Sequence, residues 1–325
     1  MGSRIVGTGR AVPPTCVSNR DLERRLDTSH EWICSRTGIV RRHVLRDGES
    51  LVDFAAEASR QALQRAGLDA NDLDAIVAGT VSSEYAFPSF ACQLQRALGI
   101  ASIPALDVAA ACSGFVYALA VADGVMRTGD WKRVLVVGAD ALSTMVNWQD
   151  RSTAVLFGDG AGAVVLVSEQ GPRGVLKSVL RSAGEMWDLL SVRATGQRGP
   201  IDGTNQRDAR DAIQMRGPEL FRIAVKSMED VTREVTEGAG VSLNDISLIV
   251  PHQANLRIIS AMMERLGLSL DRVFTNIDRY GNTSAASVPI ALDEAVEANR
   301  LHTDDLVLIN ACGGGLTWGA NLVRW

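Results

Sequence analysis

The sequence lacks the features that would place it in a membrane, a secretory route or a disulfide-bonded fold. No uncharged apolar run is long enough to cross a bilayer, and residues 1–10 contain no basic region followed by an apolar stretch. The five cysteines are scattered and form no Cys-x-x-Cys pair, so neither a disulfide framework nor a metal site is expected. We therefore expect a cytoplasmic protein that does not bind membranes.

An excess of positive charge is also missing. The net charge is −5, so the molecule as a whole does not match nucleic acid, and no nucleic-acid partner is expected. Local basic clusters do occur, at Arg24–Arg25, at Arg41–Arg42 and among the arginines between residues 193 and 222. Most of these are expected to be solvated surface, and an acidic partner would have to bind one local patch.

A complete dinucleotide-binding fingerprint is absent, although glycine is frequent. Glycine clusters occur at Gly7–Gly9, Gly158–Gly162 and Gly313–Gly315, but none forms G-x-G-x-x-G between a strand and a helix. A nucleotide-dependent oxidoreductase is therefore not expected. We interpret the clusters as close backbone approaches, and Gly313–Gly315 could offer an N–H group to an oxyanion.

The chain does contain an internal repeat. AGLDANDLDAIVAG (66–79) aligns with AGVSLNDISLIVPH (239–252) at an offset of 173, and each copy follows an amphipathic helix (53–66 and 218–238). Further on, a helix starting near Cys112 leads to a strand at 134–137, and one starting near Ser284 leads to a strand at 306–309. The pattern predicts an α/β protein of two equivalent halves, with mostly parallel sheets covered by helices.

Three predicted strand ends carry residues with catalytic potential. The strand 104–108 leads to Cys112, the strand 248–250 to His252, and a strand at 273–277 is followed by Asn282. Ligands of α/β folds bind at the carboxyl ends of strands, so we expect these three side chains to form one site.

Cys112 is the candidate nucleophile. It begins an apolar helix, where free N–H groups and the helix dipole are expected to lower the thiol pKa and favour a thioester intermediate. The alternative is a small buried hydrophobic residue, which is our interpretation of Cys16, Cys34 and Cys92.

His252 and Asn282 are less distinctive when taken singly. A histidine after a strand is often structural, and an asparagine beside glycine can be a turn residue. A Cys–His–Asn set also occurs in papain-like hydrolases, so the set alone leaves hydrolysis open beside an enolate-stabilising role for the His and Asn.

Long motifs then give a resemblance over almost the whole chain. The sequence closely resembles β-ketoacyl-acyl carrier protein synthase III of the thiolase-like condensing enzymes. The motifs are DTSHEWICSRTGI (27–39), AFPSFACQLQ (86–95), DVAAACSGF (107–115), DRSTAVLFGDGAGA (150–163), VPHQANLRIIS (250–260), GNTSAASVPIALDEAV (281–296) and GGGLTWGANLVRW (313–325).

The resemblance implies a duplicated αβαβα layered fold whose pseudo-symmetric halves are residues 1–170 and 171–325. It implies condensation of a short, acetyl-CoA-like primer with malonyl-acyl carrier protein to start fatty acid synthesis, without a cofactor apart from the coenzyme A thioester substrate. Acyl carrier protein, acyl-CoA and a second copy of the chain are the implied partners.

The family's functional positions match residues of this chain. They are Cys112, His252 and Asn282 for catalysis; the N–H groups of Cys112 and Gly314 for the oxyanion; Trp32, Arg36, Arg151 and Asn255 for coenzyme A; Arg222, Arg257 and Arg265 for the carrier protein; and Phe87, Leu142, Phe157, Trp187, Leu189 and Cys312 for the acyl pocket. Phe87 would reach across the dimer interface.

Some positions depart from the family pattern. Cys312 stands where the family commonly has Phe, Met186 and Trp187 are larger than usual, and the loop 191–212 has an unfamiliar composition. The identity of the primer therefore stays open. A priming or acyl-transfer enzyme of a polyketide pathway is the alternative, and a catalytically silent binding subunit is disfavoured because Cys, His and Asn are all present.

Overall fold

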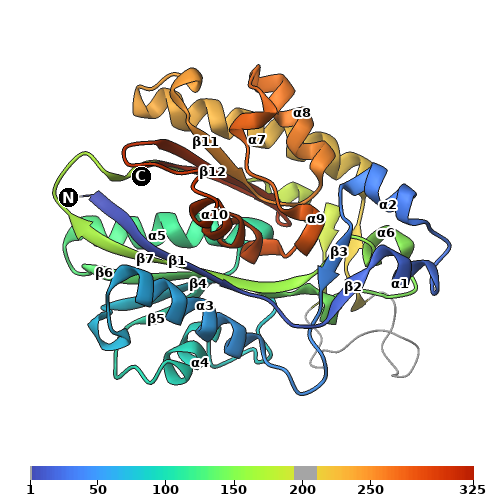
Figure 1. Cartoon of the computed structure of the whole chain (residues 1–325), viewed down its shortest axis with the longest axis horizontal. Helices are drawn as coiled ribbons and strands as arrows, with labels where there is room; N and C mark the ends of the chain where they lie inside the picture. Colours follow the sequence, from blue (N-terminus) through green and yellow to red (C-terminus); the bar gives the residue numbers. More distant parts are fainter. Residues whose placement is uncertain (1, 194–210) are drawn as a thin grey trace.

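The computed structural model describes residues 2–193 and 211–325, and its two main β-sheets are stacked with helices between and outside them (Figure 1). The first sheet has the order β1-β7-β6-β4-β5, with strands β1 (Gly2–Ala11), β4 (Ala75–Gly79), β5 (Ala105–Val108), β6 (Arg133–Ala141) and β7 (Asp159–Glu169). The second has the order β11-β12-β13-β8, with strands β8 (Gly174–Ser182), β11 (Leu248–Pro251), β12 (Leu306–Gly313) and β13 (Thr317–Arg324).

The long helices form three layers around these sheets (Figure 1). Helices α3 (Leu51–Ala66) and α4 (Phe90–Ala97) cover the outer face of the first sheet, and α7 (Gly217–Ala239) and α8 (Leu256–Leu266) cover that of the second. Helices α5 (Gly114–Thr128) and α10 (Ser287–Glu297) lie between the sheets. The five layers confirm the predicted duplicated αβαβα fold.

Several shorter elements lie together at one end of the layers (Figure 1). The small antiparallel sheets pair β2 (Cys16–Ser18) with β3 (Arg41–His43) and β9 (Leu190–Ser191) with β10 (Gln214–Met215). The short helices are α1 (Asn19–Glu23), α2 (His30–Thr37), α6 (Arg151–Ala154) and α9 (Ile277–Tyr280). The elements at that end include α1, α2, α6, β2 and β3 (Figure 1). Turns of 3₁₀ helix are η1 (Ala70–Asp72), η2 (Ala111–Ser113), η3 (Leu142–Met145), η4 (Gly184–Leu189), η6 (Leu243–Asp245), η7 (Leu270–Arg272) and η8 (Ser284–Ala286).

The repeat is visible in the strand register. In the first sheet Ala75 pairs with Val134, and in the second Leu248 pairs with Val307. Each residue of the second pair lies 173 positions after its counterpart in the first pair, which is the offset found in the sequence. The central helices begin alike, because Ala111 before α5 and Ser284 before α10 both have a left-handed backbone, with φ of 45° and 52°. The two halves therefore share their backbone geometry as well as their sequence pattern.

Two expectations about the strands were wrong. The sheets are mixed rather than mostly parallel, because β7 and β13 return beside the preceding strand and pair with it in antiparallel fashion. No long helix separates either pair of strands, and a parallel partner needs such a crossover. The expected strand 273–277 is only one bridge, Ile249 to Val273, and Ile277 already begins α9.

The central helices are held by apolar packing on both faces. One hydrophobic cluster joins both sheets to α5 and α10, with fully buried members such as Phe115, Leu119 and Leu292. The first sheet uses residues 2–169 and the second 174–324, yet they share this core. The division at residues 170 and 171 into domains stays a prediction. No helix of the described part of the chain is both long and apolar enough to span a membrane.

Most of the loop expected at 191–212 lies at 194–210, outside the described residues.

Candidate active site

Cys112 occupies a tight turn between a sheet and a central helix. It lies in η2, after β5 and before α5, and only 5% of its surface is exposed. The end of β12 packs directly against it, because a Cβ atom on Gly313 would lie 2.6 Å from the Cys112 backbone nitrogen. Glycine is required here for this close backbone approach. Sequence and packing together fix the position of the thiol.

The expected lowering of the Cys112 pKa was wrong for the free protein. Burial raises the pKa of the Cys112 thiol to about 12, and the nearby Asp140 carboxylate raises it further. A hydrogen bond from Ser284 acts in the opposite direction. Because desolvation of an anion exceeds the stabilisation by neutral dipoles, the resting group is a thiol.

His252 follows β11 and is almost fully buried, with 2% of its surface exposed. The His252 ring Nδ1 lies 2.6 Å from the Ser287 hydroxyl of α10, and the His252 backbone N–H donates to the Asn310 carbonyl at 2.8 Å. Burial lowers the pKa of His252 to about 3, so the imidazole is neutral at physiological pH. Within the described residues Nε2 has no hydrogen-bond partner, which leaves it available to a substrate.

Asn282 is held by backbone contacts on both sides. Its N–H donates to the Leu156 carbonyl at 2.9 Å, and its carbonyl accepts from the Gly158 N–H at 3.0 Å. Its side-chain Oδ1 accepts from the Ser284 N–H at 2.9 Å. Because the oxygen is engaged, the amide can offer its NH₂ group as a donor.

One cavity of about 710 Å³ brings the three predicted catalytic residues together. Cys112, His252 and Asn282 all line it, although they come from different strand ends. Its wall is mainly apolar and includes residues that the sequence analysis did not single out, namely Thr37, Ser152, Val155, Leu156, Leu190, Met215, Gly217, Pro218, Leu220, Phe221, Ala224, Ala254 and Ile258. The cavity can hold an acyl chain beside a thiol and two neutral hydrogen-bonding groups.

The predicted coenzyme A residues gather at the same cavity. Trp32, Arg36 and Asn255 line it, and the Arg151 guanidinium lies over the Trp32 ring, 5.1 Å from its centroid. Arg151 also donates to the Asp27 carbonyl at 2.7 Å, which holds it in this place. An aromatic face and a guanidinium at this spacing suit a planar, anionic ligand.

The three predicted carrier-protein arginines are exposed around α7 and α8. Arg257 lines the cavity and stacks over Phe221 at 5.6 Å, and Arg265 is paired with Glu229. Arg222 has no acidic partner in the described residues. These three exposed arginines, called the basic margin below, lie on the two helices that supply part of the cavity wall, and Arg257 lines the cavity itself.

The predicted acyl-pocket residues are only partly brought together. Phe157 and Cys312 line the cavity, and Leu142 is buried in one cluster with Phe157. Leu189 is buried outside the cavity lining, whereas Phe87 and Trp187 are 86% and 64% exposed. Gly314, the predicted second oxyanion donor, is also not among the lining residues.

The reading of the other cysteines as buried residues was wrong. Cys16 and Cys92 are exposed, and Cys34 is half-buried beside His30 on α2. They lie in short edge elements and on an outer helix, where the local apolar pattern does not reveal which face is covered. None of these three lines the cavity of Cys112.

Three supporting side chains were missed, because a single serine or aspartate gives no signal in the sequence. Ser287 holds His252, Ser284 Oγ lies 3.4 Å from Cys112 Sγ, and the fully buried Asp140 accepts from the Ala285 N–H at 3.1 Å. The internal repeat could have located Ser284, because it lies 173 residues after Ala111 and begins the turn equivalent to η2.

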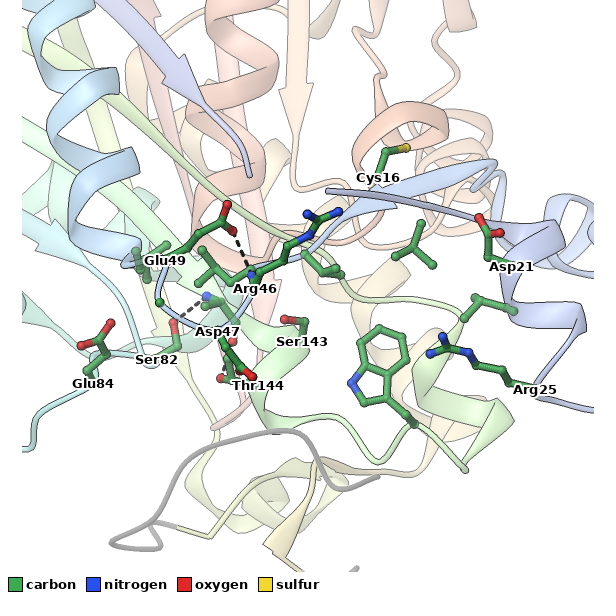
Figure 2. Close-up of a pocket in the computed structure, with 18 residues that line it drawn as sticks. Cys16, Asp21, Arg25, Arg46, Asp47, Glu49, Ser82, Glu84, Ser143 and Thr144 are labelled. Atoms are coloured by element: carbon green, nitrogen blue, oxygen red, sulfur yellow. Dashed lines mark hydrogen bonds between the residues drawn. The ribbon is translucent and has the colours of Figure 1, made fainter. Parts of the chain in front are cut away.

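A second cavity, of about 670 Å³, lies beside the small sheet β2–β3 (Figure 2). Charged side chains of both signs, including Arg25, Arg46 and Glu49, line it together with Ser82 and Ser143. None of the predicted catalytic or coenzyme A residues lies there.

Comparisons with known proteins agree with this geometry. Two family models match, 3-oxoacyl-[acyl-carrier-protein] synthase III over residues 106–184 and its C-terminal part over residues 236–325. The chain is 47% identical over 321 residues to a β-ketoacyl-[acyl-carrier-protein] synthase III of Roseiflexus castenholzii, covering 99% of this chain and 97% of the relative.

Solved structures show the same similarity. The 3-oxoacyl-[acyl-carrier-protein] synthase III of Aquifex aeolicus is 45% identical with a TM-score of 0.93, and all of both chains is covered. The priming β-ketosynthase of the R1128 polyketide pathway is 32% identical with a TM-score of 0.90, covering 99% of this chain and 96% of the other.

Proposed function

The chain belongs to the β-ketoacyl-[acyl-carrier-protein] synthase III family, and from this premise we propose how Cys112, His252 and Asn282 divide its reaction. The enzyme is a condensing acyltransferase of fatty acid biosynthesis. It joins a short acyl group from coenzyme A to malonyl-acyl carrier protein, with loss of CO₂, and forms a β-ketoacyl-acyl carrier protein.

In the first half-reaction, Cys112 attacks the acyl-CoA thioester. The acyl–sulfur bond to coenzyme A breaks, a thioester to Cys112 forms, and the cysteine proton ends on the departing coenzyme A thiol. The Cys112 and Gly314 N–H groups would stabilise the oxyanion. The burial of Cys112 supports this assignment, because a neutral thioester fits an apolar cavity better than a thiolate does.

In the second half-reaction, His252 and Asn282 bind the malonyl thioester carbonyl. As CO₂ leaves, its bonding electrons form an enolate, and the enolate carbon then attacks the Cys112 thioester and releases the thiolate. Ser287 accepts the Gln253 N–H at 3.3 Å, so its own proton is free to be donated to His252 Nδ1. The single ring proton of the neutral imidazole is then on Nε2, and this N–H can donate a hydrogen bond to the enolate oxygen.

Substrate binding follows from the walls of the cavity. Trp32 and Arg151 would hold the adenine ring, Arg36 a phosphate, and Asn255 the pantetheine arm of coenzyme A. Arg222, Arg257 and Arg265 would steer the acidic carrier protein to the same opening. This local basic margin explains how a chain of net charge −5 can bind an acidic partner.

We also propose a homodimer in the cytoplasm that needs no cofactor. Phe87 is 86% exposed and Tyr85 58% exposed, and large apolar side chains left in water on one loop are typical of an interface. Phe87 of one copy would then close the acyl pocket of the other. Sedimentation analysis of Phe87→Arg should give monomers where the unaltered chain gives dimers; two monomeric or two dimeric samples would contradict the proposal.

The observation that carries the mechanism is the convergence of Cys112, His252 and Asn282 on one cavity. Intact-mass measurement with a panel of straight and branched acyl-CoAs tests it. The unaltered chain and His252→Ala should both gain the acyl mass, and Cys112→Ala should gain none. His252→Ala should not release CO₂ from malonyl-acyl carrier protein.

Acyl transfer that persists in Cys112→Ala, or that is lost in His252→Ala, would overturn this division of roles. The same panel identifies the primer. A marked preference for an acyl group not used in fatty acid synthesis would favour the alternative function, a priming enzyme of a polyketide pathway. The similarity to the R1128 priming ketosynthase is the observation that supports this alternative.

A further inference from the structure

Cys112 has one side-chain hydrogen-bond partner in the described residues, and the mechanism above does not use it. The Ser284 hydroxyl lies 3.4 Å from the Cys112 sulfur, and both residues are buried, with 1% and 5% of their surfaces exposed. The contact therefore lies in the interior of the protein, where a hydrogen bond is stronger than in water.

The surroundings of the sulfur offer little other help to a negative charge. Asp140 interacts unfavourably with an anion at Cys112, and His252 is neutral. Among residues 2–193 and 211–325, no lysine, arginine or protonated histidine shifts the Cys112 pKa. Stabilisation of the thiolate must come from neutral donors, namely the N–H groups at the start of α5 and the Ser284 hydroxyl.

Ser284 is also held in place more firmly than an ordinary turn residue. Its backbone has φ of 52°, a left-handed conformation that is strained for a residue with a side chain. Two hydrogen bonds maintain it: the Ser284 N–H donates to Asn282 Oδ1 at 2.9 Å, and the next N–H, of Ala285, donates to Asp140 Oδ2 at 3.1 Å.

The Asp140 carboxylate has donors of its own. Burial raises the pKa of this carboxyl, and the hydrogen-bonding groups around it act in the opposite direction. Thr80, Val81 and Ser82 already donate to Oδ1 of this carboxylate, at 3.1, 2.9 and 2.8 Å, and Ser82 also lines the cavity of Figure 2. With the Ala285 N–H, Asp140 has four donors, so it does not need the Ser284 hydroxyl, which can donate to Cys112.

A hydroxyl has one proton and donates it to one acceptor at a time. We propose that Ser284 is a further catalytic residue, whose hydroxyl donates to the Cys112 sulfur whenever that sulfur carries negative charge. Ser284 keeps its proton throughout. It acts when Cys112 attacks acyl-CoA and again when the Cys112 thiolate is released by the condensation. This inference rests on the proposed role of Cys112 as the nucleophile.

The reactivity of Cys112 toward iodoacetamide tests the role of Ser284 without any substrate. The rate is measured from about pH 6 to about pH 10, and the adduct is located on Cys112 by peptide mass spectrometry. Ser284→Ala removes the hydroxyl and keeps Cβ. Ser284→Gly removes both and also relieves the left-handed backbone, so the two variants separate the hydroxyl from the strain.

Both variants should alkylate Cys112 roughly ten- to a hundredfold more slowly at a given pH, since a hydrogen bond to a charged group changes an equilibrium by about that factor. Acylation by acyl-CoA should slow in parallel. Alkylation at the unaltered rate in Ser284→Ala would overturn the proposal. So would a slow Ala variant with a fast Gly variant, because the backbone rather than the hydroxyl would then be responsible.

Failure of the proposed function is distinguishable from failure of this inference. If the unaltered chain does not acylate Cys112 from acyl-CoA, the proposed function fails whatever the alkylation rates are. A larger loss of malonyl decarboxylation than of Cys112 alkylation in Ser284→Gly would also count against the inference, because it would mean that Ser284 acts by holding Asn282.

Discussion

Adding one methyl group at Gly313 should misplace the nucleophile. In Gly313→Ala the new Cβ would lie 2.6 Å from the Cys112 nitrogen, 3.0 Å from the Ser113 nitrogen and 3.2 Å from the Cys112 Cα. All three atoms are backbone, so no flexible side chain can move aside. Ordinary contact begins at 3.4 Å, so η2 and the end of β12 must separate by about 0.8 Å.

A shift of that size is large for catalysis and moderate for stability. A displacement of about 1 Å can cost roughly a hundredfold in rate, and we expect a loss of that order in Cys112 acylation. Overpacking of a core typically costs about 1–3 kcal/mol of unfolding free energy. The variant should therefore fold, with a lower Tm, and acylate slowly.

Stopped acylation reactions followed by intact-mass analysis measure this effect. Gly124→Ala is the matched control, because it lies on α5, the helix that Cys112 precedes, and a Cβ there meets no atom within 4 Å. An alanine in that exposed helical position should stabilise the protein by about 0.5–1 kcal/mol and leave acylation unchanged. If Gly313→Ala acylated as fast as Gly124→Ala, the close approach of β12 would not position Cys112.

Three further outcomes follow from the same site. Ser287→Ala should reduce malonyl decarboxylation about tenfold while acylation of Cys112 continues, since the hydrogen bonds lost are those to His252 Nδ1 and from the Gln253 N–H, and neither reaches Cys112; equal loss of both activities in a half-reaction assay would contradict this. Trp32→Ala should raise the KM for acyl-CoA about three- to thirtyfold without a matching fall in kcat, and a change in kcat alone would refute a binding role. Between about pH 6.5 and pH 3 the unfolded chain binds a proton at His252 and the folded chain does not, because the pKa of His252 is lowered in the folded state. The stability of the fold is therefore lost as the pH falls through this range. Tm measured against pH should fall less steeply in His252→Gln than in the unaltered chain or in a control variant at the exposed His302.

The repeat, and the gathering of Cys112, His252 and Asn282 at one cavity, could be predicted from the sequence because both depend on local patterns. The offset of 173 marked the repeat, and the ends of β5 and β11 pointed to Cys112 and His252, whereas the strand expected before Asn282 is a single bridge. The sheet directions could not be obtained in this way. A buried apolar strand reads the same in either direction, so the antiparallel return of β7 and β13 left no mark in the periodicity.

The state of Cys112 was also beyond the sequence. A helix start predicts a stabilised thiolate, but the desolvation that outweighs it depends on every wall of the cavity. Contacts such as Ser284 to Cys112 join residues 172 positions apart, and a lone serine carries no signature of such a role. The fold must be known before either effect can be weighed.

The two left-handed turns, at Ala111 and Ser284, have a consequence for the division of labour between the halves. A duplicated fold provides the same sharp turn twice, at facing ends of two central helices, but a reaction in two steps needs only one covalent carrier. At the common offset of 173, the position of Cys112 is occupied in the second half by Ala285. The second turn holds no cysteine; its Ser284 hydroxyl lies 3.4 Å from the Cys112 sulfur, so the duplicated turn contacts the cysteine of the first half instead of duplicating it.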